Sequence, residues 1–252
     1  KMKAIILAAG YATRLYPLTK DFPKPLLEVG GKAILDHIIP KIERVRQIDG
    51  IYVITNHRFY NIFLDWAHQA GYSKGIKIID DLTTTNENRL GAIADLWFAI
   101  EREQLGEDLL VMAGDNLFDF EVTAMVDFYQ QKGTDIIAAH EVNDLERLRR
   151  TGVVQIDGES KVIGFEEKPV SPKSNLAVPP FYIYQKSTAL HCIKKYLDEG
   201  NNPDAPGHFI PWLINQKPVH VYRFNGERYD IGAMESYQKV NDLFIKRSQR
   251  VN

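Results

Sequence analysis

Leu7–Leu26 reads Leu-Ala-Ala-Gly-Tyr-Ala-Thr-Arg-Leu-Tyr-Pro-Leu-Thr-Lys-Asp-Phe-Pro-Lys-Pro-Leu. It begins inside the continuous apolar run Lys3–Ala8, a pattern typical of a central β-strand that is buried on both faces. The carboxyl edge of this strand leads directly into Ala9 and Gly10, and glycine lets a backbone approach a ligand closely. The sequence therefore predicts a ligand-binding turn at the edge of a buried sheet.

Two cations follow this turn within a proline-rich loop. Arg14 carries a planar, permanently charged fork, and Lys24, between Pro23 and Pro25, adds a compact point charge; both suit phosphate. Consecutive amides around Gly10 can add a concave nest of donors. The alternative is a tight turn followed by a loop of solvated basic residues. Because the prolines restrict the backbone and so hold the charges in place, we interpret the segment as a polyphosphate site.

Strand-like and helix-like segments alternate through the first half of the chain, which favours a parallel sheet covered on both faces. Ligands of such sheets bind beyond the carboxyl ends of the strands, where Gly10 and the Gly114–Asp115 turn are expected. The predicted strands cover Lys3–Ala8, Ile51–Thr55, Ile76–Ile79, Leu109–Ala113 and Asp135–Ala139, and the predicted helices cover Ile34–Val45, Phe59–Ala70, Ala92–Glu101 and Val122–Gln131.

The second half is less regular and contains a strong hairpin signal at Asp157–Gly158. We expect an α/β fold, a Rossmann-like three-layer sandwich with a mostly parallel central sheet and a smaller lobe. It is predicted as a single domain over residues 1–252, with halves at 1–140 and 141–252. The further predicted strands cover Gly152–Ile156, Lys161–Glu166, Phe181–Gln185 and Val219–Phe224, and the further helices cover Ser187–Asp198, His208–Asn215 and Met234–Lys246.

The composition is that of a globular enzyme domain, with 44% hydrophobic and 25% charged residues. A formal net charge of −2 provides no basic field for nucleic acid or an anionic membrane, so local cations must hold any polyanionic substrate. The single cysteine, Cys192, is expected to be reduced. Since neither a secretion signal nor an apolar run near membrane-spanning length is visible, we expect a cytoplasmic protein.

The loop resembles the signature of the nucleoside-diphosphate-sugar pyrophosphorylases, the sugar-1-phosphate nucleotidyltransferases, which runs L-A-G-G-x-G-x-R-L-x-P-L-T, a spacer, then P-K-P. The matching residues are Arg14–Leu15, Pro17–Thr19 and Pro23–Pro25. Ala9 and Ala12 stand where the family usually has glycines. A dinucleotide-binding fingerprint is the other candidate for a glycine turn after a first strand, but G-x-G-x-x-G is absent.

Two aspartates are implied as ligands of Mg²⁺ by the same resemblance. Asp115 follows the buried run Leu109–Ala113, and taken alone it would be interpreted as a turn or helix-capping residue. In the family this Gly-Asp pair carries a metal-binding aspartate. Asp230 lies in Arg228–Gly232, which resembles the late motif W-x-D-x-G with Arg228 in place of the tryptophan. Mg²⁺ suits such a site because it prefers a few carboxylates together with phosphate oxygens.

The resemblance also implies residues that bind the two substrates. Glu167 and Lys168 match the E-K-P motif, in which the Glu contacts sugar hydroxyls and the Lys the sugar-linked phosphate; otherwise they would be a solvated strand end. Gly152 matches a glycine that approaches the hexose, and otherwise it opens a hairpin. Asn86 and Gly91 stand where relatives contact the base. A short amide followed closely by a glycine favours a pyrimidine nucleotide, dTTP or UTP.

The implied activity is transfer of a nucleoside monophosphate from a nucleoside triphosphate to a sugar 1-phosphate, with release of pyrophosphate. The implied catalytic residues are Arg14, Lys24 and Lys168, and the metal ligands are Asp115 and Asp230. The nucleotide site comprises Leu7, Ala8, Ala9, Gly10, Arg14, Lys24, Asn86 and Gly91, and the acceptor site comprises Gly152, Glu167 and Lys168. The first half would then bind mainly nucleotide and the second half mainly acceptor. Assembly into a homo-oligomer is left open.

Two other functions fit the same loop. A cytidylyltransferase that acts on phosphocholine or a similar non-sugar phosphate would lack a hexose pocket, so Gly152 and Glu167–Lys168 argue against it. A catalytically silent sensor of nucleotides or sugars would not need both the metal ligands and the cations for the leaving group. The identity of the product distinguishes these functions.

Overall fold

A ten-stranded sheet forms the centre of the computed structural model, which describes residues 1–251. Its strand order is β10-β9-β11-β8-β12-β6-β1-β4-β5, and β13 pairs with β8. The strands are β1 (Met2–Leu7), β4 (Ile48–Thr55), β5 (Ile76–Asp80), β6 (Asp108–Ala113), β8 (Asp135–Glu141), β9 (Gly152–Ile156), β10 (Val162–Glu167), β11 (Leu176–Val178), β12 (Phe181–Tyr184) and β13 (Val219–Arg223). Each strand predicted from the sequence is present, with ends that differ by at most a few residues.

Parallel pairing dominates the part of the sheet built by the first half of the chain. β1 pairs parallel with both β4 and β6, β5 with β4, and β13 with β8. β12 runs antiparallel between β6 and β8, and β11, β9 and β10 extend the sheet antiparallel into the smaller lobe. The predicted α/β fold with its large, mostly parallel central sheet is confirmed.

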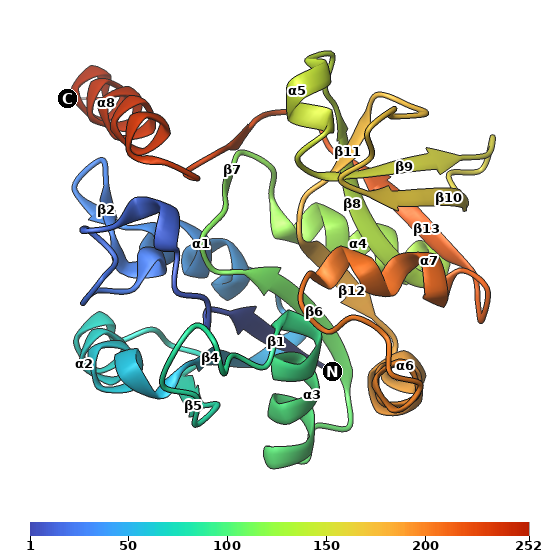
Figure 1. Cartoon of the computed structure of the whole chain (residues 1–252), viewed down its shortest axis with the longest axis horizontal. Coiled ribbons are helices and arrows are strands. Elements are labelled where there is room, and N and C mark those ends of the chain that lie inside the picture. Colours follow the sequence, from blue (N-terminus) through green and yellow to red (C-terminus); the bar gives the residue numbers. More distant parts are fainter. Residues whose placement is uncertain (252) are drawn as a thin grey trace.

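Helices cover both faces of the sheet (Figure 1). Ile6 of β1 belongs to the apolar cluster under α1, α2 and α4, whereas its neighbour Ile5 belongs to the cluster under α3, α6 and α7. Successive side chains of a strand point to opposite faces, so a strand buried between two helix layers must be apolar throughout. The helices are α1 (Ile34–Glu43), α2 (Tyr60–Ala70), α3 (Ala92–Arg102), α4 (Val122–Lys132), α6 (Ile193–Asp198) and α7 (Phe209–Leu213).

Several short elements have no counterpart in the sequence predictions. They include β2 (Glu28–Val29), β3 (Lys32–Ala33), β7 (Leu117–Phe118), β14 (Arg228–Tyr229) and α5 (Leu145–Leu148). The predicted helix Ser187–Asp198 is instead a π-helical turn over Thr188–Cys192 followed by α6. Strands of two residues carry no periodicity, so only their pairing in the fold reveals them. Among residues 1–251, no helix is long and apolar enough to cross a membrane.

The C-terminal helix α8 (Met234–Arg250) extends beyond the predicted end at Lys246 and lies beside β2 (Figure 1). The Tyr237 hydroxyl donates a hydrogen bond to the Glu28 carbonyl at 2.6 Å, and the Asn241 side chain accepts one from the Gly30 amide at 2.9 Å. These contacts join the end of the chain to the segment that follows the proline-rich loop. They therefore fix the chain just after Gly232 close to that loop.

Candidate active site

The two predicted ligand-binding turns lie next to each other at the edge of the sheet. Leu7 at the end of β1 is in register with Ala113 at the end of β6, and the Gly114 amide donates to the Leu7 carbonyl at 2.9 Å. A Cβ at Gly114 would approach Ile6 Cγ2 to 2.9 Å, so this tight crossing requires a glycine. Parallel pairing therefore brings Gly10 and Asp115 to one place.

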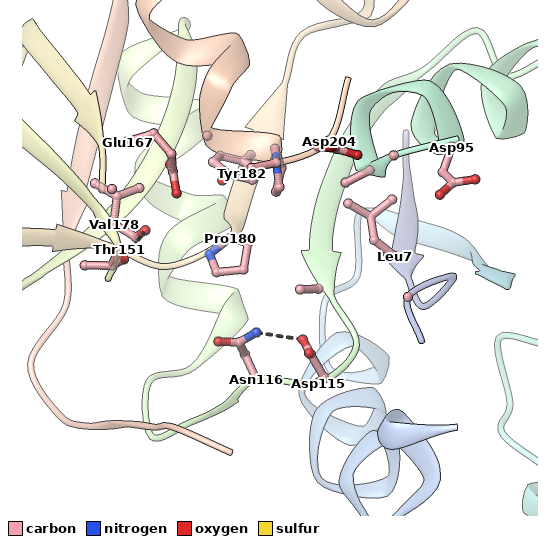
Figure 2. A pocket seen from close by; sticks show the side chains of 18 of the residues that line it. Leu7, Asp95, Asp115, Asn116, Thr151, Glu167, Val178, Pro180, Tyr182 and Asp204 are labelled. Carbon is pink, nitrogen blue, oxygen red and sulfur yellow. Dashed lines mark hydrogen bonds between the residues drawn. The ribbon is translucent and has the colours of Figure 1, made fainter. Parts of the chain in front are cut away.

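A cavity of about 500 Å³ opens beyond these strand ends (Figure 2). It contains residues predicted for the nucleotide, the metal and the acceptor. Those residues are Leu7, Ala9, Gly10, Gly91, Asp115, Gly152 and Glu167. In Figure 2, Leu7 and Asp95 lie on one side of the cavity, Glu167 and Thr151 on the other, and Asp115 and Asn116 at its base. The cavity thus spans both halves of the chain, and the sheet holds its two walls in place.

A second cavity of about 180 Å³ adjoins the first and shares Leu7, Gly10 and Asp115 with it. Arg14 and Lys24 line it, and Lys24 Nζ lies 3.1 Å from Asp115 Oδ2. Burial alone would raise the pKa of Asp115, but the Lys24 ammonium and the Asn116 amide outweigh burial and hold this pKa below its usual range. The Asp115 carboxylate is therefore ionised between the two cavities.

The loop that carries Arg14 is fixed by its own backbone. Ala12 has a φ of +48°, and its carbonyl accepts hydrogen bonds from the Leu15 amide at 3.0 Å and from Thr19 Oγ1 at 2.7 Å. A left-handed conformation favours glycine, which the family signature has at this place. The loop keeps that conformation with an alanine, and Arg14 lines the small cavity.

Asp230 reaches the same region from the far end of the chain. β14 pairs antiparallel with β7, which places Tyr229 opposite Leu117 and brings the late motif beside Asp115. A Cβ built on Gly232 would lie 3.3 Å from both Arg14 Nη2 and Asp230 Oδ1. Gly232 therefore leaves room for the guanidinium and the carboxylate, and any side chain there would crowd both.

Three predicted site residues, the metal-ligand candidate Asp230 together with Asn86 and Lys168, are not among those that line either cavity. Asn86 lies beyond Arg89, whose guanidinium donates to the Asn86 carbonyl at 2.8 Å and itself lines the large cavity. Lys168 is exposed and has a φ of +48°; its amide donates to the Thr151 carbonyl at 3.0 Å. The role of Asn86 in binding the base and the role of Lys168 in binding the acceptor phosphate remain predictions.

Glu167 closes the acceptor side of the cavity. Its Oε2 lies against Gly207, where a side chain could not fit, and 3.3 Å from the position of a Cβ on Gly152. Burial raises the pKa of Glu167, although His208 and Lys168 act in the opposite direction. His208 ends a short 3₁₀ turn directly before α7, close to the predicted start of that helix. The two glycines leave room for the Glu167 carboxylate at the wall of the cavity.

Several polar residues of the large cavity were not predicted from the sequence motifs, among them Asn116, Arg228 and Asp95. Arg228 Nη1 donates to Asn116 Oδ1 at 2.6 Å, and Asn116 Nδ2 donates to Asp115 Oδ1 at 2.8 Å. Asn116 follows Asp115 directly, and Arg228 replaces the tryptophan of the late motif, so both carried a signal in the sequence. Asp95 carried none, because an isolated acid on a helix is ordinarily solvated.

Asp95 and Asp81 form a buried acid pair beside the cavity, 5% and 4% exposed. Asp81 Oδ1 accepts hydrogen bonds from the Thr83 amide at 2.8 Å and from the Thr83 hydroxyl at 2.7 Å. Burial, and then the adjacent Asp81, raise the pKa of Asp95 to about 9. Two carboxylates at close range cannot both ionise, so Asp95 keeps its proton at neutral pH.

The acid pair makes the folded state bind a proton that the unfolded state has released above about pH 4. The Asp95 contribution to stability is therefore full below that pH and is lost as the pH rises toward 9, by up to about 1.4 kcal/mol per pH unit. We expect Asp95→Asn, which cannot titrate, to flatten this decline in urea unfolding between pH 5 and 9. The exposed Asp65→Asn on α2 serves as the control and keeps the wild-type slope. Parallel curves for wild type and Asp95→Asn would refute the shared proton.

Known proteins resemble this chain along almost its whole length. The glucose-1-phosphate adenylyltransferase of Fervidobacterium nodosum is 30% identical over 259 residues, which are 94% of this chain and 60% of that protein. The glucose-1-phosphate adenylyltransferase of Lachnospira eligens is 28% identical over 254 residues, or 96% of this chain and 59% of that protein. The chain thus spans about three fifths of the length of these relatives.

A solved structure and a family model agree with this likeness. The crystal structure of a UDP-glucose pyrophosphorylase complexed with UDP-glucose superposes with a TM-score of 0.81 at 22% identity, covering 98% of this chain and 99% of that one. This likeness shows the fold. The model of the family described as nucleotidyl transferase matches residues 3–247. Since this family model covers nearly the whole chain, the chain belongs to the nucleotidyl transferase family.

Proposed function

We propose that this protein is a Mg²⁺-dependent sugar-1-phosphate nucleotidyltransferase, which forms a nucleoside-diphosphate sugar and pyrophosphate. The single observation that carries the proposal is that the two cavities adjoin and that Asp115 lines both of them. The small cavity offers Arg14 and Lys24 to a triphosphate, and the large one offers Gly152 and Glu167 to a hexose. Reactants placed on either side of Asp115 would meet beside it.

The chemistry requires positioning and charge neutralisation more than proton transfer. An oxygen of the acceptor phosphate attacks the α-phosphorus, the bond from that phosphorus to the bridging oxygen breaks, and pyrophosphate leaves with the electron pair. A phosphate monoester is largely dianionic at neutral pH, so its oxygen needs no general base. Arg14 and Lys24 would hold the β- and γ-phosphates and neutralise the charge that grows on the leaving group.

The carboxylates present fit Mg²⁺. Asp115 is ionised at the boundary of the cavities, and Gly232 leaves the Asp230 carboxylate uncrowded. Mg²⁺ usually takes one or two protein carboxylates and completes its shell with substrate phosphates and water. When bound, the ion would neutralise charge on the reacting phosphates. Lys24, already paired with Asp115, would share that carboxylate with the ion.

The nucleotide is proposed to be dTTP or UTP. Arg89 lines the large cavity at its nucleotide end, where it pairs with Asp204 at 3.4 Å. A Cβ on Gly91 would lie 2.6 Å from the Pro203 carbonyl oxygen, so segment 203–204 is packed closely against the start of α3. An arginine and a packed loop both take up room beside the expected base position. This restriction supports the smaller base.

Product analysis tests the proposal. The four common ribonucleoside triphosphates and dTTP are each incubated with glucose, mannose and glucosamine 1-phosphates or phosphocholine, and products are identified by mass spectrometry. One pyrimidine nucleotide is expected to exceed the others by more than about tenfold, because a site that hydrogen-bonds one base edge rejects analogues that leave its groups unpaired. A preference for ATP or GTP would refute the pyrimidine assignment. Phosphocholine as the only productive acceptor would refute the sugar assignment, and no product from any pair would favour the silent sensor.

A further inference from the structure

Arg228 has a charge without a partner at the acceptor end of the large cavity. Its guanidinium donates to the neutral Asn116 side chain at 2.6 Å, and among the ion pairs of residues 1–251 none includes Arg228. A guanidinium stays protonated in proteins, and a partly buried charge is costly unless an opposite charge compensates it. The cavity is the open side of Arg228, so the missing anion would come from a ligand.

The neighbours of Arg228 add positive charge at this end. Arg150 lines the same cavity without a carboxylate partner in the described chain. Asp230 and Asp115 attract the Arg228 charge without forming an ion pair with it, and Arg147 and Arg150 repel it. His140, 5% exposed and stacked on Phe224, has a pKa of about 4, lowered first by burial and then by Arg228, so it is neutral. Among the acids that line the cavity, Asp115 already pairs with Lys24. Arg228 and Arg150 therefore both line the cavity, and neither has an ion-pair partner among the described residues.

The position of Arg228 fits one particular anion. It is linked through Asn116 to Asp115, beside which the reacting phosphates of the proposed function would meet. Lys168, the residue that the family motif would assign to the acceptor phosphate, is exposed and does not line the cavity. The late motif has a tryptophan where this chain has Arg228, so this cation is a feature of this chain and not of the motif.

We propose that Arg228 binds the phosphate group of the acceptor, with Arg150 supporting it electrostatically. This inference rests on the proposed function, because it is the transfer reaction that brings a sugar phosphate to this end. One N–H of Arg228 holds Asn116, and the remaining N–H groups can bind two phosphate oxygens in a fork. Asn116 thereby orients the guanidinium, and the third phosphate oxygen is left to face the α-phosphorus.

Steady-state kinetics separate this role from a merely structural one. Arg228→Gln keeps an N–H donor for Asn116 but removes the charge, so we expect KM for the acceptor to rise about tenfold or more, as for a lost charge-assisted hydrogen bond. KM for the nucleotide should change less than about twofold. The acceptor KM of Arg228→Lys should lie between those of wild type and Arg228→Gln. The control is Arg223→Gln on β13, an exposed arginine that pairs with Glu141 outside the cavity. A lower kcat with an unchanged acceptor KM would show instead that Arg228 only positions Asn116 and Asp115.

Calorimetric titration with inorganic phosphate needs no turnover. Both proteins compared carry Arg14→Gln, which weakens the other phosphate site, and one also carries Arg228→Gln. We expect the added substitution to raise the dissociation constant for phosphate about tenfold or more, and Arg223→Gln added in its place to leave that constant unchanged. Equal affinities in properly folded proteins would overturn the proposal. If wild type forms no nucleotide sugar, the proposed function fails, and the titration still decides whether Arg228 binds phosphate.

Discussion

We expect Arg14→Ala to lower turnover by about a hundredfold or more, the range found when one preorganised donor to developing charge is deleted. Arg14 lines the small cavity with Lys24, and its Nη2 lies beside Gly232, on the side of Asp115 opposite the acceptor. The charge on pyrophosphate grows as the bond breaks, so the loss should fall mainly on kcat. KM for the acceptor should barely change, since Arg14 does not line the large cavity in which we propose that the acceptor binds.

The matched control is Arg44→Ala, which removes an exposed arginine that pairs with Glu121 outside both cavities. It should leave kcat and both KM values unchanged. Circular dichroism and the melting temperature establish that Arg14→Ala is folded. Unaltered turnover in a folded Arg14→Ala protein would remove Arg14 from the mechanism.

We expect Asp115→Asn and Asp230→Asn each to abolish activity or to raise the Mg²⁺ concentration needed for half-maximal activity. Each substitution keeps the shape of the side chain and withdraws the negative charge that a hard cation requires. Asp115→Asn should have the larger effect, because it also leaves Lys24 without its ion pair at 3.1 Å. Activity measured against Mg²⁺ concentration, together with Mn²⁺ binding followed by electron paramagnetic resonance, provides the test.

Asp127→Asn on α4 controls for the loss of an exposed aspartate far from the motifs and should titrate with Mg²⁺ like wild type. The competing interpretation treats Asp115 and Asp230 as turn residues, whose loss lowers stability and nothing else. If both variants show the wild-type Mg²⁺ dependence but melt at a lower temperature, the turn interpretation is correct.

The sequence by itself determined the strands of the central sheet and the turn that follows β1. A strand buried on both faces needs apolar residues at every position, and Lys3–Ala8 shows that pattern without reference to any other part of the chain. The turn after it depends on Gly10 and on closely spaced cations and prolines. Because such signals lie within a window of about ten residues, the strands could be predicted locally, whereas the phosphate-binding role of the loop stays a prediction.

The tertiary structure alone decided which distant residues share the cavity walls. Asn116 and Arg228 are 112 residues apart, and they meet because the two-residue strands β7 and β14 pair. Gly207 lies against Glu167 although it comes from the turn before α7. The short strands and the turn show no periodicity from which their partners could be predicted. The topology of the sheet, and not local propensity, therefore sets these contacts.

The ionisation states of buried groups also depend on the tertiary structure and not on the local sequence. Asp95 and Asp81 look like ordinary surface acids in the sequence, and only the fold buries both, places them next to each other and raises the pKa of Asp95 to about 9. In the sequence, Arg228 could be recognised as a departure from a motif. Only the tertiary structure showed that its charge has no ion-pair partner among the described residues. A residue's type is local, whereas the solvent and the charges that act on it come from every element packed around it, which is why only the fold could define these two groups.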